Sequence, residues 1–169
     1  MDNISDWINL NELVLNITKS SYMIMSPATR NNFTNNCTLN INNHVLKCVN
    51  HTTFLWIILD DTLSWKLHIN NICGKISRLC GIFLKARQVL YGQTLLLLYD
   101  SLVKPHVIYC IANWGNTYKT YMHKLHLMQK RILRIITNSE FHAHTALLFA
   151  KHNIMSIHEL HEYFCISKH

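Results

Sequence analysis

Glycine and proline are scarce in this sequence, at 4 and 2 of its 169 residues. This scarcity excludes a collagen-like chain and a chain dominated by loops, because both depend on these two residues. Apolar residues make up 49% of the chain, which is enough to form the core of one ordinary domain or of two small ones. We therefore expect a folded protein.

Long apolar runs are also lacking. Runs such as Phe54–Leu59 and Leu95–Tyr99 fall well short of the roughly 18 residues that a membrane-spanning helix requires. The first residues include Asp2, Asp6 and Glu12 and do not have the basic start and apolar stretch of a secretory signal. The six cysteines contain no CxxC pair, which suits small buried side chains in a reducing compartment. We expect an intracellular protein, cytoplasmic or nuclear, with no membrane partner.

Acidic side chains are nearly absent from the middle of the chain. Residues 62–138 contain a single acid, Asp100, against eleven basic residues, so this segment alone carries a net charge of +10. Such an excess favours a polyanionic partner, because each phosphate that Lys or Arg neutralises releases condensed counterions. A solvated basic surface is the alternative interpretation.

The hydrophobic pattern predicts an α+β fold. Strands are predicted over residues 20–25 and 38–59, with a hairpin turn at Asn42-Asn43, because Asn tolerates the left-handed conformation of tight turns. The end of the second run, residues 54–59, is apolar on both faces, which predicts a central or covered strand.

After Trp65 apolar residues recur at steps of three and four, the period of helices. Helices are predicted over residues 69–83, 93–114 with an interruption at Pro105, 122–135, 145–151 and 156–166. The inner stripes of the first and third are Ile69, Ile72, Cys73, Ile76, Leu79, Cys80 and Phe83, and then Met122, Leu125, Met128, Ile132 and Ile135.

Three groups of residues follow one another in a specific order. The first is Trp7, Asn11, Leu13, Leu15, Asn16, Lys19, Tyr22 and Met23, the second is Phe54, Leu55, Asp60, Leu63, Ser64, Trp65, His68 and Ile69, and the third includes Gly81, Pro105, Trp114, Gly115, Gln129, Lys130, Arg131 and Arg134. Together they resemble the reverse transcriptase of LINE-type (non-LTR, jockey-like) retrotransposons, in the part after the polymerase active site. The resemblance covers nearly the whole chain.

The resemblance implies a small antiparallel palm remnant with a primer-grip-like hairpin in residues 1–64, followed by a mainly α-helical, thumb-like region in residues 65–169. The parent family is an RNA-directed DNA polymerase that uses two divalent metal ions, Mg, bound by an F/Y-x-D-D turn. That turn belongs upstream of Trp7. We therefore expect a fragment that lacks the catalytic aspartates and the N-terminal polymerase half, needs no cofactor and does not polymerise. Asp60-Asp61 is no substitute, because the family has a noncatalytic Asp there.

Four residues fall at nucleotide-side or primer-side positions of the family, and one of them, Trp56, departs from its pattern. Lys19 matches a Lys near the incoming nucleotide, with a surface lysine in a turn as the alternative. Phe54, Leu55 and Trp56 match the primer grip, but Trp56 stands where the family has Gly, which lets a backbone approach closely. We therefore expect the usual primer geometry to be lost. The indole either packs in the core, which the apolar run favours, or stacks on a base.

Six basic side chains are candidates for contacting a nucleic-acid backbone: Lys75, Arg78, Lys85, Lys130, Arg131 and Arg134. The first three fall between the apolar positions of the first long helix. Lys130 and Arg134 are one turn apart, which predicts that they share one side of their helix. Phosphate contacts of this kind position a duplex without reading its sequence.

His158, His161 and Cys165 are spaced so that they share one helix face, and a zinc ion could use them with His142 or His144. The spacing matches no recognised closed zinc site, so no metal site is predicted. We expect weak, salt-sensitive and sequence-tolerant binding of RNA or of an RNA/DNA hybrid. Two alternatives stay open: a noncatalytic helical module that binds a protein through apolar faces, and a decayed reading frame without selected function.

Overall fold

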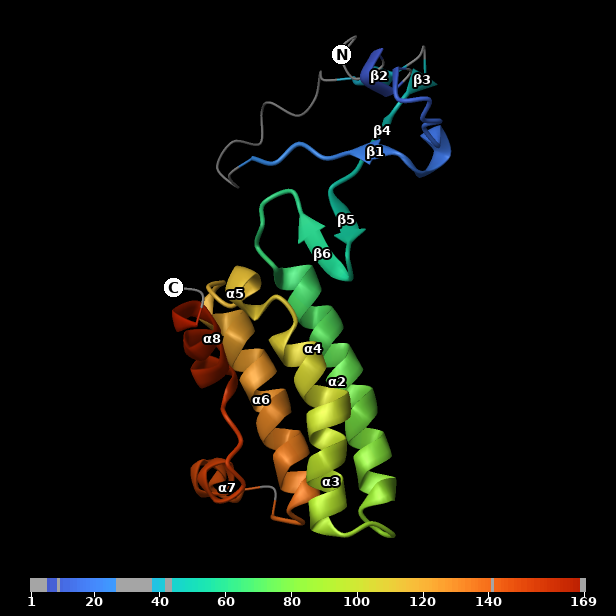
Figure 1. The fold of residues 1–169 in the computed structure, drawn as a ribbon. Helices are drawn as coiled ribbons and strands as arrows, with labels where there is room; N and C mark the ends of the chain where they lie inside the picture. Colours follow the sequence, from blue (N-terminus) through green and yellow to red (C-terminus); the bar gives the residue numbers. More distant parts are fainter. Residues whose placement is uncertain (1–5, 9, 27–37, 42–43, 141, 168–169) are drawn as a thin grey trace. The chain divides into compact units, whose positions relative to one another are not determined.

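The computed structural model describes residues 6–8, 10–26, 38–41, 44–140 and 142–167 (Figure 1). The protein is mixed α+β, 57% helical with short strands in small sheets. The chain divides into two compact units, Met1–Ser64 and Trp65–His169. The division lies where the hydrophobic period of the sequence lengthens to that of helices.

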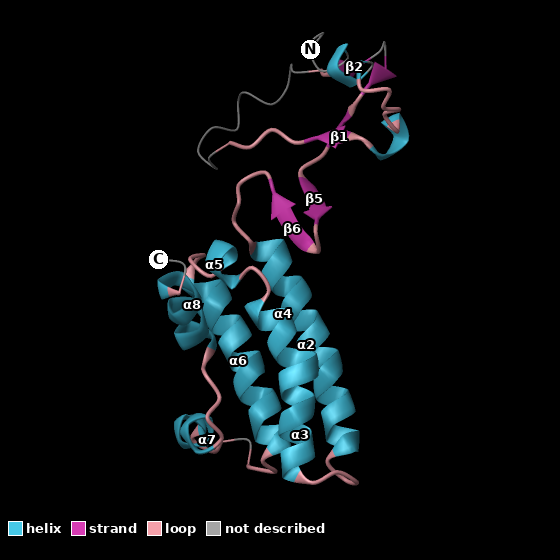
Figure 2. Cartoon of the chain, in the orientation of Figure 1, coloured by secondary structure: helices cyan, strands magenta, loops and turns pink. Residues whose placement is uncertain are grey.

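The first unit contains paired short strands (Figure 2). Its elements are the one-turn 3-10 helix η1 (Ile17–Lys19) and the strands β1 (Ser21–Tyr22), β2 (Asn40–Ile41), β3 (His44–Val45), β4 (Lys47–Cys48), β5 (His51–Phe54) and β6 (Ile57–Asp60). Strands β2 and β3 pair antiparallel, and the turn predicted at Asn42-Asn43 lies outside the described residues. The small antiparallel remnant that we expected is found only in part, because β2–β3 and β5–β6 pair antiparallel but β1–β4 does not. Strands of two to four residues form separate pairs, and β1 runs parallel to β4.

The prediction of one covered strand over residues 54–59 is wrong, because the chain reverses direction within this segment. Phe54 pairs with Ile57, and Leu55 and Trp56 form a two-residue turn with φ of 45° and 68°. Two positive φ angles are what a type I′ hairpin turn requires, and this turn follows the twist of the strands that it joins. The side chains of Phe54, Leu55 and Trp56 are 62%, 65% and 78% exposed, so the indole does not pack in a core.

The carboxylate of Asp60 holds the turn that follows β6. Its Oδ1 accepts hydrogen bonds from the N–H and hydroxyl of Thr62, at 3.2 and 2.8 Å, and from the N–H of Ser64, at 2.8 Å. Its Oδ2 accepts from the Ser64 hydroxyl at 3.1 Å. Burial alone would raise the pKa of Asp60, but these hydrogen bonds outweigh it and hold the pKa below the ordinary value of 3.8. The segment from Asp60 to Ser64 therefore forms a turn around a charged carboxylate.

The second unit is a helical bundle around one core (Figure 1). Helix α2 (Lys66–Ala86) packs along α6 (Lys119–Ile136), and both contact a helical rod made of α3 (Gly92–Leu98), the π-helical turn η2 (Tyr99–Val103) and α4 (Lys104–Ile108). Three shorter helices, α5 (Ile111–Trp114), α7 (Thr145–Lys151) and α8 (Ile157–Ile166), complete the unit. The helices predicted from the sequence are confirmed.

The predicted inner stripes of α2 and α6 are confirmed as well. In α2, six of the seven predicted residues are buried and Leu79 is partly buried against the core. In α6, Met128 is the one partly buried member, and the other four are buried. Each fully buried aliphatic side chain contributes about 1.5–3 kcal/mol to folding, so these stripes fix which faces of α2 and α6 point outward.

The interruption predicted at Pro105 takes the form of the π-helical turn η2. Proline lacks an N–H, and its ring crowds the carbonyl four residues earlier. The backbone widens just before it, and the Lys104 N–H bonds the Tyr99 carbonyl, five residues back. The rod therefore continues to Ile108, and left-handed Cys110, with φ of 54°, separates it from α5.

Gln129 joins three elements of the second unit through its buried side chain, which is 1% exposed. Its Nε2 donates to the Tyr99 hydroxyl at 3.0 Å and to the Met155 carbonyl at 2.9 Å, and its Oε1 accepts from the Ile157 N–H at 2.9 Å. Burial raises the pKa of Tyr99 to about 12, so its hydroxyl stays neutral. The amide connects α6 to η2 and to the first residue of α8, whose N–H has no partner within its own helix.

Replacing Gln129 by Leu should lower the free energy of unfolding by about 2–4 kcal/mol, because the Ile157 N–H and the Met155 carbonyl lose a buried partner. Urea unfolding followed by circular dichroism measures the loss. Tyr99→Phe removes one of the three hydrogen bonds and serves as the control, with an expected loss of about 0.5–1.5 kcal/mol. Equal losses in the two variants would show that the bonds to Met155 and Ile157 contribute nothing.

Acid should loosen the Asp60 turn. A lowered folded-state pKa gives a stabilisation that is complete above the unfolded-state pKa, about 3.9, and is lost as the pH falls through the folded-state value. We therefore expect hydrogen exchange of the Thr62 and Ser64 amides, corrected for intrinsic rates, to accelerate below about pH 4. In Asp60→Asn, which does not titrate, this acceleration should disappear. Persistence of the acceleration in that variant would exclude Asp60 as its cause.

Candidate nucleic-acid interface

The basic side chains of the second unit gather on α2 and α6, two helices whose sequences contain no acid. The two helices run in the same direction. Near their starts, Lys124 Nζ donates a hydrogen bond to Asn70 Oδ1 at 2.7 Å, and residues of their last turns line the same surface hollow, described below. Figure 1 shows both helices ending at the same end of the bundle. Their cations are Lys66, Lys75, Arg78 and Lys85 on α2, and Lys119, Lys124, Lys130, Arg131 and Arg134 on α6.

Of the three α2 candidates, Arg78 and Lys85 are exposed and Lys75 is partly buried. Arg78 and Lys85 are two helical turns apart and therefore share the outer face of α2. Lys75 lies on the flank near α4: burial lowers the pKa of His68 and of His106, and the charge of Lys75 lowers both further. The outer face of α2 is thus the part that a polyanion reaches most easily.

The three α6 candidates do not line a common surface. Lys130 lines a hollow between α6, α7 and α8, whereas Arg131 and Arg134 line a second hollow at the ends of α2 and α6. Lys130 and Arg134 are one helical turn apart on α6 but line different hollows, because α7 and α8 pack against α6 beside Lys130. Arg134 donates from Nε and Nη2 to the Ala143 carbonyl, at 3.2 Å each, and so also holds the segment that follows α6.

The second hollow, of about 190 Å³, is the strongest concentration of positive charge among the described pockets. Its lining residues are Leu84, Arg87, Arg131, Arg134, Ile135 and Ser139, with three guanidinium groups and no carboxylate. We call it the arginine hollow. Sequence reasoning missed Arg87 because this residue follows the last turn of α2, and no local pattern indicates that the end of α6 lies beside it.

The nucleotide-side and primer-side candidates all belong to the first unit. Lys19 is exposed at the end of η1, where its N–H bonds Asn16 Oδ1 at 3.3 Å. Phe54, Leu55 and Trp56 form the exposed tip of the β5–β6 hairpin. The structure therefore places Lys19 in a turn and gives the hairpin tip an open apolar surface.

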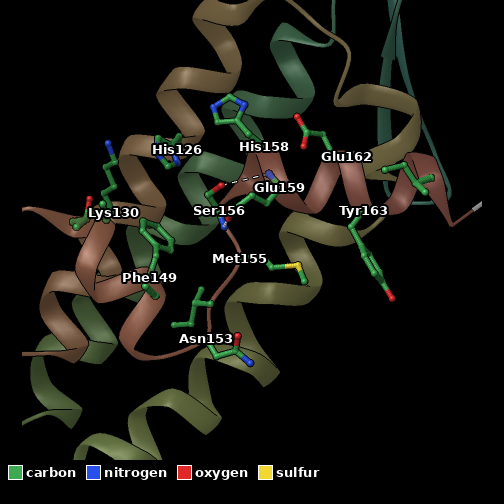
Figure 3. A pocket seen from close by; sticks show the side chains of 15 residues that line it. His126, Lys130, Phe149, Asn153, Met155, Ser156, His158, Glu159, Glu162 and Tyr163 are labelled. Atoms are coloured by element: carbon green, nitrogen blue, oxygen red, sulfur yellow. Dashed lines mark hydrogen bonds between the residues drawn. The ribbon is translucent and has the colours of Figure 1, made fainter.

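The larger hollow, of about 700 Å³, is shown in Figure 3. His126 and Lys130 come from α6, Phe149 from α7, and His158 and Glu162 from α8. The His126 ring stacks on Phe149, with centroids 5.9 Å apart and planes at 16°, and meets the His158 ring edge-on at 5.3 Å. Burial lowers the pKa of His126, and the charges of Lys130 and His158 lower it further. The hollow is therefore apolar at its aromatic wall and mixed in charge at its rim.

The three residues considered for zinc do not converge. His158 lines the larger hollow, whereas His161 Nε2 lies 3.4 Å from Cys165 Sγ. The ring of His161 also occupies the space that a Cβ on Gly115 would need. In the part of the chain that the structure describes, no group of three or more His, Cys, Asp or Glu side chains is arranged to hold a metal ion.

Known proteins offer no guide to this surface. Comparison of the chain with protein-family models, with curated proteins and with solved structures finds no match. Among the described helices, none is long and apolar enough to cross a membrane.

Replacing either of two exposed glycines of α2, Gly74 or Gly81, by alanine should stabilise the protein. An added Cβ meets nothing within 4 Å at either position, and Gly inside a helix costs about 0.5–1 kcal/mol relative to Ala. We expect Gly74→Ala and Gly81→Ala each to raise the free energy of unfolding by that amount in urea titrations. Gly115→Ala is the contrasting control, with a loss of about 1–3 kcal/mol, because its Cβ would overlap His161 and lie 2.6 Å from the Ile111 carbonyl. A loss at Gly74 would mean that its backbone departs from an ordinary helix.

Proposed function

We propose that the second unit binds the phosphate backbone of RNA or of an RNA/DNA hybrid through α2 and the C-terminal turns of α6. The observation that carries this proposal is that two parallel helices free of acidic residues meet at a hollow lined by three arginines. Each phosphate neutralised there releases counterions, so binding is weak at high salt and strong at low salt. Contacts to phosphates carry no base information, and the binding is therefore sequence-tolerant.

The same proposal includes an origin in the palm and thumb of a LINE-type reverse transcriptase. Support comes from the order of the three residue groups that resemble the family. Several residues of these groups also stabilise the fold. Asp60 holds its turn, Trp114 is fully buried, and Gln129 connects three elements. An intracellular location, in the cytoplasm or nucleus, follows from such a ligand. Polymerisation is not proposed, since Asp60 is engaged by Thr62 and Ser64 and no described segment reads F/Y-x-D-D.

A second candidate function is a helical module that binds a protein. The observation in its favour is the hollow of about 700 Å³ between α6, α7 and α8, which Phe149 and Tyr163 line. Such a hollow can receive an apolar side chain of a partner. Ala146→Glu places a charge in this hollow, and it should abolish binding of a protein there while sparing RNA.

Charge reversal at exposed positions tests nucleic-acid binding. The double variant Arg78→Glu, Arg131→Glu should lower affinity for a 20-nucleotide RNA about tenfold or more at low salt, because it removes phosphate contacts and adds repulsion. Both side chains are exposed. Fluorescence anisotropy at several salt concentrations measures both the affinity and its salt slope.

The matched control is Lys47→Glu, Lys151→Glu, which makes the same change in net charge at exposed positions outside α2 and α6. This control should lower the affinity for RNA only about twofold, because it weakens the long-range electrostatic attraction and removes no phosphate contact. Equal losses in the two double variants would reduce the proposal to a general effect of net charge. A flat salt response of the unmodified protein would refute it.

A further inference from the structure

The turn that joins α2 to α3 ends in an exposed aromatic ring. Tyr91, the residue that directly precedes α3, is 87% exposed, more than any other tyrosine that the structure describes. No hydrogen bond or ring contact joins its side chain to another described residue. A phenol ring that does not pack within its own chain has its flat faces available to a ligand.

The backbone holds this ring in a defined place. The N–H groups of Val89 and Leu90 both donate to the Ala86 carbonyl, at 3.0 and 2.8 Å, and the N–H of Leu95 donates to the Tyr91 carbonyl at 3.1 Å. Hydrogen bonds therefore anchor the chain on both sides of Tyr91. A ring presented by an ordered backbone loses little conformational entropy when a ligand binds to it.

Exposed cations lie beside the same turn. Arg87 is four residues before Tyr91, so their Cα atoms are at most about 14 Å apart. Arg87 and Arg131 line one hollow, and Lys85 belongs to the last turn of α2. All three cations are exposed, and no described carboxylate pairs with any of them. Figure 1 shows the connection between α2 and α3 at the end of the bundle where α6 also ends.

A nucleic-acid strand combines the two chemistries that this end of the bundle offers. Each nucleotide has an anionic phosphate and a planar base, and every base has a face that stacks on an aromatic side chain. Inside a duplex these faces are covered by the neighbouring base pairs, so the base that stacks must be unpaired or terminal. An anionic membrane also offers charge and apolar area, but its affinity grows with the apolar area that inserts. Val89 and Tyr91 provide little such area, whereas one ring is sufficient for one base.

We propose that Tyr91 stacks on an unpaired base of the RNA strand whose phosphates contact Arg87 and Arg131. The inference rests on the proposed function and deepens it, because it names the ligand as single-stranded RNA or as the single-stranded end of a hybrid. Stacking accepts any base, so the binding stays sequence-tolerant.

The test compares two RNAs of equal charge on the full chain, at the same salt concentration. One is a ten-nucleotide oligouridine, and the other has the same length and an abasic sugar at every position. We expect oligouridine to bind at least about fivefold more tightly by fluorescence anisotropy, because the abasic strand keeps the phosphates and lacks the stacking faces. In Tyr91→Leu, which keeps an apolar side chain but no ring, the ratio of the two affinities should fall to about one. In Tyr91→Trp it should be retained or rise.

Tyr118 provides the matched control. This residue is also an exposed tyrosine, and it directly precedes α6. Because α6 has 18 residues, about 27 Å of helix separates Tyr118 from the end at which Arg87 and Arg131 lie. Tyr118→Leu should leave the ratio of affinities unchanged. An equal fall in Tyr118→Leu and Tyr91→Leu, or a ratio that survives in Tyr91→Leu, would overturn the inference.

The remaining outcomes separate this inference from the proposed function. Salt-sensitive binding of both RNAs with equal affinity would overturn stacking on Tyr91 and leave backbone binding intact. Binding of neither RNA would overturn both. Binding to vesicles that contain phosphatidylserine, lost in Tyr91→Leu and without any preference for oligouridine over the abasic strand, would assign the turn to a membrane surface and overturn the inference for RNA.

Discussion

The second unit depends on the buried amide of Gln129. A buried amide must have its donors and acceptor paired, and Tyr99, Met155 and Ile157 provide that pairing from η2 and from the start of α8. Together with the buried apolar stripe of α6, this arrangement fixes the rotation of α6 about its axis. Because neighbouring residues of a helix differ by about 100° in direction, the direction of Gln129 also sets the directions of the basic residues that follow it.

The consequences for function follow from that rotation. Lys130 lines the hollow that α7 and α8 close, whereas Arg131 and Arg134 reach the end of α2 and meet Arg87. Two hollows of different chemistry therefore arise from adjacent residues. One has an aromatic wall and a rim of mixed charge, and the other has three guanidinium groups. Because α2 and α6 run parallel, the cations on the outer face of α2 and the arginine hollow belong to the same side of the bundle. Little acidic charge is present there to repel a polyanion.

The first unit is organised by turns. Asp60 draws the N–H groups of Thr62 and Ser64 around one carboxylate, and the β5–β6 hairpin reverses at Leu55 and Trp56 in the left-handed region. Side chains other than glycine are strained there. In the proposed origin from a reverse transcriptase, Trp56 stands where that family has Gly. That Gly suits a turn of this kind, and the tryptophan places a large exposed ring at its tip.

Local patterns were sufficient to predict the inner stripes of α2 and α6 and a disturbance of the helix near Pro105, because periodicity and the missing N–H of proline act over a few residues. The helical backbone nevertheless continues through Pro105 to Ile108. Local patterns were not sufficient for residues 54–59, where the strand ends and the turn are equally apolar, so composition does not mark the reversal. Nor did they predict that Arg87 meets Arg131 while Lys130 turns away, or that His158 and His161 line different surroundings. Those outcomes depend on which helix faces pack together, and that is decided by contacts between residues far apart in the sequence, above all by the pairing of Gln129.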